Sequence, residues 1–246
     1  MAFEDVKAKQ KRKTLANGGG SFTLTPYFGS DADPEQPHAH FSQPDPGLVS
    51  STHFHRLDQF QVVVGGKGSI GRHQLSPYCV HFSRAYTPYG PLVSDPQEGL
   101  EFIAMRAHYD AGSQRFPQER QQLERVANRR PWQITRQVIF PERTDAEVGL
   151  HTVPDISDEK GLAVYALTLK PGMRMTAPDP RHGDGQYLVV VKGSVILDAG
   201  QEKRALALVF STPADGLLHV QAGKDGLQAI ILNFPRPDAV IAAEKA

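Results

Sequence analysis

The chain has 246 residues, enough for two domains of about 120 residues each, a size that buries a core without disulfides. Lys and Arg together number 27, as do Asp and Glu, so no overall charge attracts nucleic acid or an acidic membrane. The single cysteine, Cys79, excludes an internal disulfide framework. The sequence has no signal-peptide core and no apolar run of membrane-spanning length, so the default expectation is a soluble cytoplasmic protein.

The first half of the sequence is typical of a tail followed by short strands. Residues 1–20 are polar and end in three glycines, which predicts a flexible N-terminal tail. Alternation at 21–27 predicts a strand, and the stretch 29–46, rich in Pro and Asp, predicts a long loop that contains His38 and His40. Further β-rich segments are expected at 51–82 and 99–107.

A helical pattern interrupts the strands at 117–130. Pro117 near the first turn, Glu119 within that turn and Pro131 as the stop are its signals. Its apolar stripe is thin, which favours a short connector on the surface and a domain boundary near residue 125. Strands are expected again at 134–140, 162–170, 187–197, 206–210 and 227–234. Two successive β units with little helix predict an all-β fold.

One segment of the chain occurs twice. The octapeptide Gln59–Gly66, QFQVVVGG, returns as Gln186–Gly193, QYLVVVKG, at an offset of 127 residues. Two further pairs keep this offset, His55 with His182 and Gly99-Leu100 with Gly226-Leu227. Because several landmarks recur in one order, the chain is predicted to contain one structural unit twice.

The first half also carries a regularly spaced set of Gly, His and Gln residues. Five residues separate Gly47 from the His53-Phe54-His55 triplet, three more precede Gln59, and six more precede Gly66. This pattern resembles the first signature of the cupin superfamily, in which a Glu stands at the position of Gln59. Pro88-Tyr89-Gly90 is similar to the start of the second signature. The resemblance extends over both halves and identifies the chain as a bicupin.

The resemblance implies two tandem cupin-type β-barrels, each a double-stranded β-helix or jelly roll, joined by the short helical connector. The barrels would span residues 21–125 and 126–246. Family members commonly hold a divalent metal on His and Glu side chains. Residues two apart in a strand face the same side, so His53 and His55 can both point inward. With Gln59 they form the candidate ligand set for one Fe, Mn, Ni or Zn ion in the N-terminal barrel.

Both halves depart from the metal-binding pattern of the family. Gln59 offers a neutral oxygen in place of a carboxylate, and Val93 stands at the position of the third His. In the second half Pro180 replaces the first His, whereas the third His is restored. Buried amides and imidazoles need hydrogen-bond partners, so these side chains are candidates to contact a ligand directly. The candidate ligand-binding residues are Gln59, Arg181, His182, Gln186 and His219.

Two functions from different classes remain open. The first is a metal-free or weakly metallated protein that binds a small polar molecule in one or both barrels. The second is a divalent-metal-dependent enzyme of the isomerase, dioxygenase or hydrolase type, acting on a small oxo-acid or sugar-derived substrate, with His73, Tyr86 and Tyr89 as candidate catalytic residues. A scaffold with side-chain-filled barrels is a third alternative. Neither nucleic acid nor membrane is expected as a partner, and an edge strand at 21–27 favours a homodimer.

Overall fold

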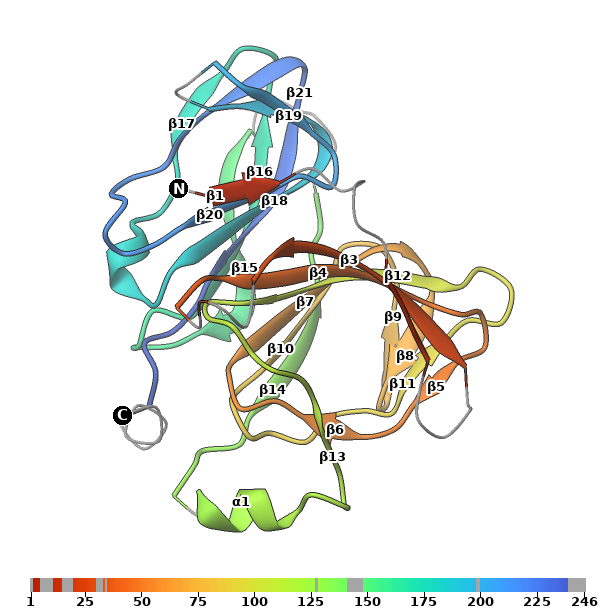
Figure 1. Cartoon of the computed structure of the whole chain (residues 1–246). Coiled ribbons are helices and arrows are strands. Elements are labelled where there is room, and N and C mark those ends of the chain that lie inside the picture. The colour runs from red at the N-terminus through yellow and green to blue at the C-terminus, as the bar shows by residue number, and fades with distance from the viewer. Residues whose placement is uncertain are drawn as a thin grey trace. The chain divides into compact units, whose positions relative to one another are not determined.

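The computed structural model describes residues 2–4, 11–14, 20–29, 33, 35–126, 128–140, 148–197 and 200–238 (Figure 1). The chain divides into two compact units. The N-terminal unit comprises Lys7–Gln137 with Pro237–Ala246, and the C-terminal unit comprises Val138–Arg236 with Met1–Val6. Antiparallel strands dominate both units, which confirms the β-rich class expected from the sequence.

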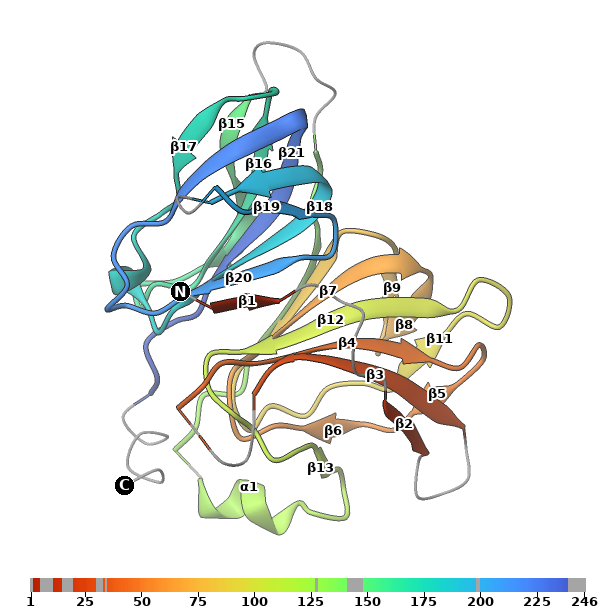
Figure 2. The same ribbon diagram turned by 45° about the horizontal axis from the view of Figure 1, so that its top comes forward.

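The N-terminal unit is organised around one large antiparallel sheet with the order β14-β10-β7-β12-β4-β3-β2. Its strands are β2 (Lys11–Thr14), β3 (Ser21–Phe28), β4 (His38–Pro44), β7 (Gln59–Gly66), β10 (Cys79–Ser83), β12 (Leu100–Arg106) and β14 (Gln133–Gln137). A smaller sheet, in the order β5-β11-β8-β9, is built from β5 (Val49–Ser50), β8 (Gly68–Ile70), β9 (His73–Leu75) and β11 (Leu92–Ser94). A short ribbon joins β6 (His53–Phe54) to β13 (Gln114–Arg115). Figure 2 shows β3, β4, β12 and β7 side by side in this unit.

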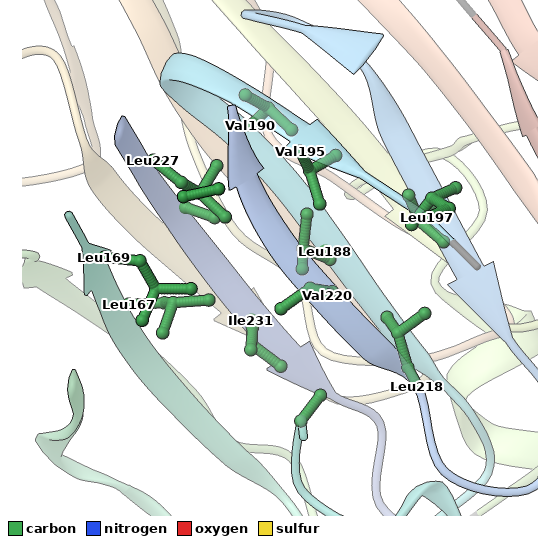
Figure 3. Close-up of a cluster of buried hydrophobic side chains, with 14 of the residues drawn as sticks. Leu167, Leu169, Leu188, Val190, Val195, Leu197, Leu218, Val220, Leu227 and Ile231 are labelled. Carbon is green, nitrogen blue, oxygen red and sulfur yellow. The ribbon is translucent and has the colours of Figure 1, made fainter. Parts of the chain in front are cut away.

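The C-terminal unit contains a second antiparallel sheet, with the order β1-β20-β18-β21-β16-β15 and with β17 and β19 paired to β21 and β18. Its strands are β1 (Ala2–Glu4), β15 (Gly149–Ser157), β16 (Ala163–Leu169), β17 (Arg174–Thr176), β18 (Gln186–Ile196), β19 (Glu202–Arg204), β20 (Leu208–Ser211) and β21 (His219–Asn233). A short 3₁₀ helix, η2 (Pro180–His182), precedes β18. Leu, Ile, Val and Ala side chains from β16, β18 and β21 pack against one another to form the core of this unit (Figure 3).

The repeated octapeptide has the same structural place in both units. It forms β7 between β10 and β12, and it begins β18 between β20 and β21. Even the first pair in the register agrees, since Gln59 lies opposite Ser83 and Gln186 lies opposite Ser211. The duplication inferred from the sequence therefore extends to strand order and register.

The glycines that end the repeat are required by the backbone. Gly66 and Gly193 have φ values of 65° and 72°, in the left-handed region that glycine adopts without strain. A Cβ atom at Gly66 would lie 2.3 Å from the carbonyl oxygen of Gly99, and one at Gly193 would lie 2.0 Å from that of Gly226. Both copies thus use glycine for the same close approach to the neighbouring strand.

The helical segment is shorter than expected and belongs to the N-terminal unit. Among the described residues of the predicted stretch 117–130, only α1, Gln121–Arg125, is an α-helix, and its N-cap residue makes no side-chain capping bond. Leu123 of α1 and the adjacent Val126 are buried against Phe54 and Tyr86. Beyond α1 the chain returns to pair β14 with β10, so the N-terminal unit continues past residue 125. Among the described residues, no helix is long and apolar enough to cross a membrane.

Parts of the predicted N-terminal tail form strands. β1 pairs with β20 in the C-terminal unit, and β2 pairs with β3 in the N-terminal unit. The rest of the predicted tail, apart from Gly20, lies outside the described residues. Pairing with the edge of an existing sheet supplies the hydrogen bonds that a polar segment lacks by itself.

Candidate functional site

The inner face of the N-terminal sheet lines a cavity of about 260 Å³, here called the polar cavity. Alternate residues of three neighbouring strands face it, because side chains two apart share one face of a strand. These residues are His38, His40 and Ser42 of β4, Gln59 and Gln61 of β7, and Phe102, Ala104 and Arg106 of β12. His53, His55, Tyr89 and Asp110 add polar groups at one end, whereas Phe22, Leu24 and Leu92 add apolar ones. The cavity thus combines a polar end with an apolar wall.

The position of β4 corrects the interpretation of 29–46 as a loop. His38 and His40 lie in a strand that is paired with β12 on one side and with β3 on the other. The ladder on both sides supplies backbone hydrogen bonds, which override the local preference of the surrounding prolines for a loop. Because the two histidines are two residues apart, both face the cavity.

Strand register explains why the cavity is hollow. Ala104 of β12 lies between Gln61 of β7 and His40 of β4, and the three residues form one row across the sheet, perpendicular to the strands. Its methyl group is much shorter than the side chains that flank it, so space remains above the sheet at this point. In the next row Arg106 lies opposite His38.

The equivalent row of the C-terminal unit is filled. There Ile231 lies opposite Leu188 of β18 and opposite Tyr165 of β16. Leu188 and Ile231 are fully buried in the apolar cluster of Figure 3, and Tyr165 packs against it. A hollow polar row in one unit therefore corresponds to a packed apolar row in the other.

Arg106 is the centre of a hydrogen-bonded network at the polar end of the cavity. Its side chain is only 3% exposed, and its Nε lies 3.2 Å from Oδ2 of Asp110. Its Nη2 donates to Oε1 of Gln59 and lies 3.1 Å from Nε2 of His55. His55 closes the network, because its Nδ1 lies 2.6 Å from the same carboxylate oxygen of Asp110. The guanidinium is therefore neutralised by one carboxylate and held by one amide and one imidazole.

The charges in this network follow from burial and from the ion pair. Burial lowers the pKa of His55 to about 3, and the positive charge of Arg106 lowers it further. The hydrogen bond to Asp110 acts in the opposite direction but is the weaker effect. Burial alone would raise the pKa of Asp110, but the hydrogen bond from His55 and the charge of Arg106 outweigh it and hold that pKa below its usual range. Neutral His55 then carries its proton on Nδ1, donates to Asp110 and accepts from Arg106.

Tyr89 links His53 to the same network. Nδ1 of His53 lies 2.9 Å from the carbonyl oxygen of Ser51, so Nδ1 carries the proton and Nε2 accepts from the Tyr89 hydroxyl at 3.0 Å. That hydroxyl also accepts from Nε2 of Gln59 at 2.5 Å. Burial raises the pKa of Tyr89 to about 12 and lowers the pKa of His53, so both side chains are neutral at physiological pH.

These contacts do not fit a divalent cation at the predicted ligands His53, His55 and Gln59. The structure brings the three side chains to one cavity, but Nε2 of His55 and Oε1 of Gln59 both accept from Arg106. Those are the lone pairs that a metal would require, and a dication would stand beside a buried charge of the same sign. No group of three or more His, Cys, Asp or Glu side chains is positioned to hold a metal ion within the described ranges.

The three candidate catalytic residues lie in different environments. Tyr89 contacts the network at the polar cavity, as described above. His73 is exposed on β9 and does not line the cavity. Tyr86 is buried in an apolar cluster with Phe54 and Leu123, and its backbone N–H donates to the carbonyl oxygen of His55. Of these three side chains, the structure brings only Tyr89 to the predicted metal ligands.

The candidate residues of the C-terminal unit have separate local partners. Gln186 is buried, and its Nε2 donates to Oδ1 of Asn233 and to the carbonyl oxygen of Pro178, each at 2.8 Å. His219 is exposed and bonded to Thr176. His182 and Arg181 are also exposed, and Arg181 forms an ion pair with Asp179. Gln186 is thus a buried structural partner, while the other three face solvent.

Several residues of the site were not among those predicted from the sequence. A signal for Arg106 existed, because it falls in the alternation Phe102, Ala104, Arg106, which places a charge on the inner face of an apolar strand. Asp110 lies in the segment after β12 and had no such signal. His81 of β10 is also buried; its Nδ1 lies 2.9 Å from Oγ1 of Thr135, and its Nε2 has no hydrogen-bond partner within the part of the chain that the structure describes.

Comparison with known proteins gives similarity in structure only. No protein-family model matches the sequence, and no curated protein matches it. A candidate dioxygenase from Nostoc punctiforme superposes with a TM-score of 0.63 at 15% identity, covering 97% of this chain and 84% of that one. The bacterial pirin YhhW from Escherichia coli, in complex with nickel(II), gives 0.58 at 11% identity, covering 93% of this chain and 100% of that one.

A third similar structure is the formate complex of oxalate decarboxylase from Lactobacillus farciminis. It has a TM-score of 0.57 at 11% identity and covers 96% of this chain and 86% of that one. Identities this low show likeness of fold and leave function to be argued from the site itself. All three neighbours have the cupin fold, and this chain shares that fold.

Proposed function

We propose that the polar cavity of the N-terminal unit binds a small polar molecule and that this binding requires no metal. The observation that carries the proposal is a pair of buried polar side chains facing the cavity. Gln61 is 7% exposed and Ser42 is 1% exposed, both line the cavity, and neither side chain makes a hydrogen bond within the described part of the chain. Buried amides and hydroxyls in native proteins are almost always hydrogen-bonded, so a bound molecule is expected to supply these partners.

The electrostatics of the cavity favour an uncharged ligand. The charge of Arg106 is balanced by Asp110 at 3.2 Å, and the neighbouring imidazoles are neutral. Burial lowers the pKa of His38 to about 4, with a further contribution from the charge of Arg106. A ligand with a net charge would lose its hydration in the cavity without meeting an unpaired opposite charge. The apolar wall formed by Leu24 and Phe102 suits a ligand that also has an apolar portion.

This proposal can be tested by filling the hollow above Ala104. Ala104→Leu adds bulk between Gln61 and His40 without removing a polar group, and Ala104→Ser is a matched control of similar size. Small uncharged polar compounds are screened by thermal shift on the wild-type protein. A compound present at about 100 times its Kd should stabilise the wild type by about 2.7 kcal/mol. It should stabilise the Ser variant similarly and the Leu variant much less. The absence of any compound with this pattern would refute the proposal.

The second candidate function is a divalent-metal-dependent enzyme. It is favoured by the neighbours, since the pirin structure contains nickel(II) and an oxalate decarboxylase from Bacillus subtilis is described with Mn(II) centres. In that case a metal on His53, His55 and Gln59 would act as a Lewis acid for a small oxo-acid or sugar-derived substrate. The network around Arg106 opposes this function. Stoichiometric metal in untagged wild-type protein, lost on His55→Ala substitution, would favour the enzyme over the binding protein.

The wider organisation of the protein is also a proposal. We infer that each unit is a closed cupin barrel of the jelly-roll type and that the chain is a cytoplasmic bicupin. The matched registers of β7 and β18 support twin barrels. We further infer a homodimer formed through edge strands, which a molecular mass measured by light scattering would test. A monomeric mass at micromolar concentration would contradict the dimer.

A further inference from the structure

Three different ligand atoms converge on the guanidinium of Arg106. Nε2 of His55 lies 3.1 Å from Nη2, Oε1 of Gln59 accepts from the same nitrogen, and Oδ2 of Asp110 lies 3.2 Å from Nε. Imidazole nitrogen, amide oxygen and carboxylate oxygen are all donor types that divalent cations accept. We propose that Arg106 is a built-in cation that takes the place of a metal ion, and that His55, Gln59 and Asp110 form a latent metal site which Arg106 keeps closed.

The charge of Arg106 is permanent, which suits this role. A guanidinium keeps its proton at all physiological pH values, and this one is only 3% exposed. A dication among the same three donors would lie within a few ångströms of that charge, and repulsion between like charges is strong where water is excluded. All three donors lie against the guanidinium, which occupies the space between them that a metal ion would need.

The C-terminal unit shows that the scaffold itself does not need a cation at this position. The repeat offset that relates Gln59 to Gln186 relates Arg106 to Asn233. Asn233 accepts from Nε2 of Gln186 through its side-chain amide oxygen at 2.8 Å, without any charge, and Oε1 of Gln186 has no hydrogen-bond partner among the described residues. The same backbone therefore forms with an uncharged amide at this position, although that amide bonds Nε2 of the glutamine and Arg106 bonds Oε1. The guanidinium, together with the carboxylate of Asp110, is an addition specific to the polar cavity.

The test is a Co(II) titration of the full-length protein without a histidine tag. The variants are Arg106→Met, which removes the charge but keeps much of the stem, and Arg106→Lys, which keeps a cation. Arg56→Met is the matched control, because Arg56 is exposed and outside the cavity. Binding is followed by the visible absorption of Co(II), by metal content after gel filtration and by the thermal midpoint.

The Arg106→Met variant should bind one equivalent of Co(II) at least roughly 100-fold more tightly than the wild type. Its thermal midpoint should rise with added Co(II), and adding His55→Ala should abolish both effects. The Lys variant and the Arg56 control should behave as the wild type does.

Two outcomes would overturn the proposal. The first is a folded Arg106→Met variant that binds Co(II) no more tightly than the wild type. The second is that the wild type or the Lys variant binds stoichiometric Co(II) and loses it on His55→Ala substitution. This second outcome can be measured even if Arg106→Met fails to fold. Neither outcome depends on the ligand screen with Ala104→Leu, in which Arg106 is intact, so the two proposals can fail separately.

Discussion

Lowering the pH from about 7 to about 5 should destabilise the N-terminal unit, because the unfolded chain then binds more protons than the fold does. Burial lowers the pKa of His55 and of His81 to about 3, and that of His38 to about 4. In the unfolded chain these imidazoles regain their ordinary pKa of 6.5. Each is therefore neutral in the folded unit and becomes protonated on unfolding. Stability should fall as the pH drops below 6.5, and the loss should continue down to the folded pKa of each group.

The expected size follows from the width of this window. One pH unit corresponds to about 1.4 kcal/mol per proton, so at pH 5 each buried histidine should cost about 2 kcal/mol relative to pH 7. These three groups alone would remove about 6 kcal/mol, which is comparable with the whole stability of many domains, and His53, whose pKa burial also lowers, adds to the loss. Asp110 adds no loss in this range, because its ordinary pKa is 3.8 and its folded pKa is lower still.

The assay is urea unfolding at several pH values, followed by the fluorescence of Trp132. This is the only tryptophan of the chain and packs against Phe82, so it reports on the N-terminal unit. His81→Asn should reduce the slope of unfolding free energy against pH by about one quarter to one third between pH 6 and pH 5, because it removes one of the buried imidazoles that take up a proton on unfolding. His73→Asn, at an exposed position of β9, is the control and should leave the slope unchanged. Equal slopes for wild type and His81→Asn would refute the reasoning.

Two further predictions concern stability. Gly193→Ala should destabilise the C-terminal unit by at least about 2 kcal/mol more than Gly172→Ala, because both glycines have positive φ but only at Gly193 would a Cβ meet a backbone carbonyl. Urea unfolding followed by circular dichroism measures the difference, and equal losses would contradict the steric argument. Asp110→Ala should cost the N-terminal unit about 3 kcal/mol or more, since it leaves Arg106 buried without its counter-charge. Glu98→Ala, which breaks an exposed ion pair with Lys67, should cause no measurable loss in the same Trp132 assay.

The sequence predicts the duplicated architecture because each copy of the repeat contains the residues that favour a strand and the glycine that ends it. The run of β-branched residues in Gln59–Gly66 and Gln186–Gly193 favours a strand, and the final glycine meets a backbone requirement that recurs in each unit. The connector is harder to predict. The pattern at 117–130 shows helix signals, but only α1 forms, and β14 is drawn back to β10 by pairing that no local pattern reveals.

The sequence predicts the site residues that follow the periodicity of one strand. It does not predict those whose position depends on the register between strands far apart in the sequence. His53, His55, Gln59 and Tyr89 belong to spaced motifs and do meet at the polar cavity. Arg106 reaches His55 from 51 residues away, and its role depends on the register of β12 against β7. That register places a guanidinium in the space between the predicted ligands. The spacing of residues along the sequence does not reveal the register between two strands.

Comparison of the two units separates what the fold requires from what the polar cavity adds. Both units place a glutamine at the start of the repeated strand and give it a partner on the neighbouring strand, so that pairing belongs to the scaffold. The row Leu188, Ile231 and Tyr165 shows that the same backbone can be closed by packing. A hollow row of Gln61, Ala104 and His40 forgoes the hydrophobic stabilisation that its counterpart obtains and leaves the side-chain amide of Gln61 facing the cavity. A fold that can be filled, but is left open at one row in one unit, is the arrangement that the proposed binding of a small molecule requires.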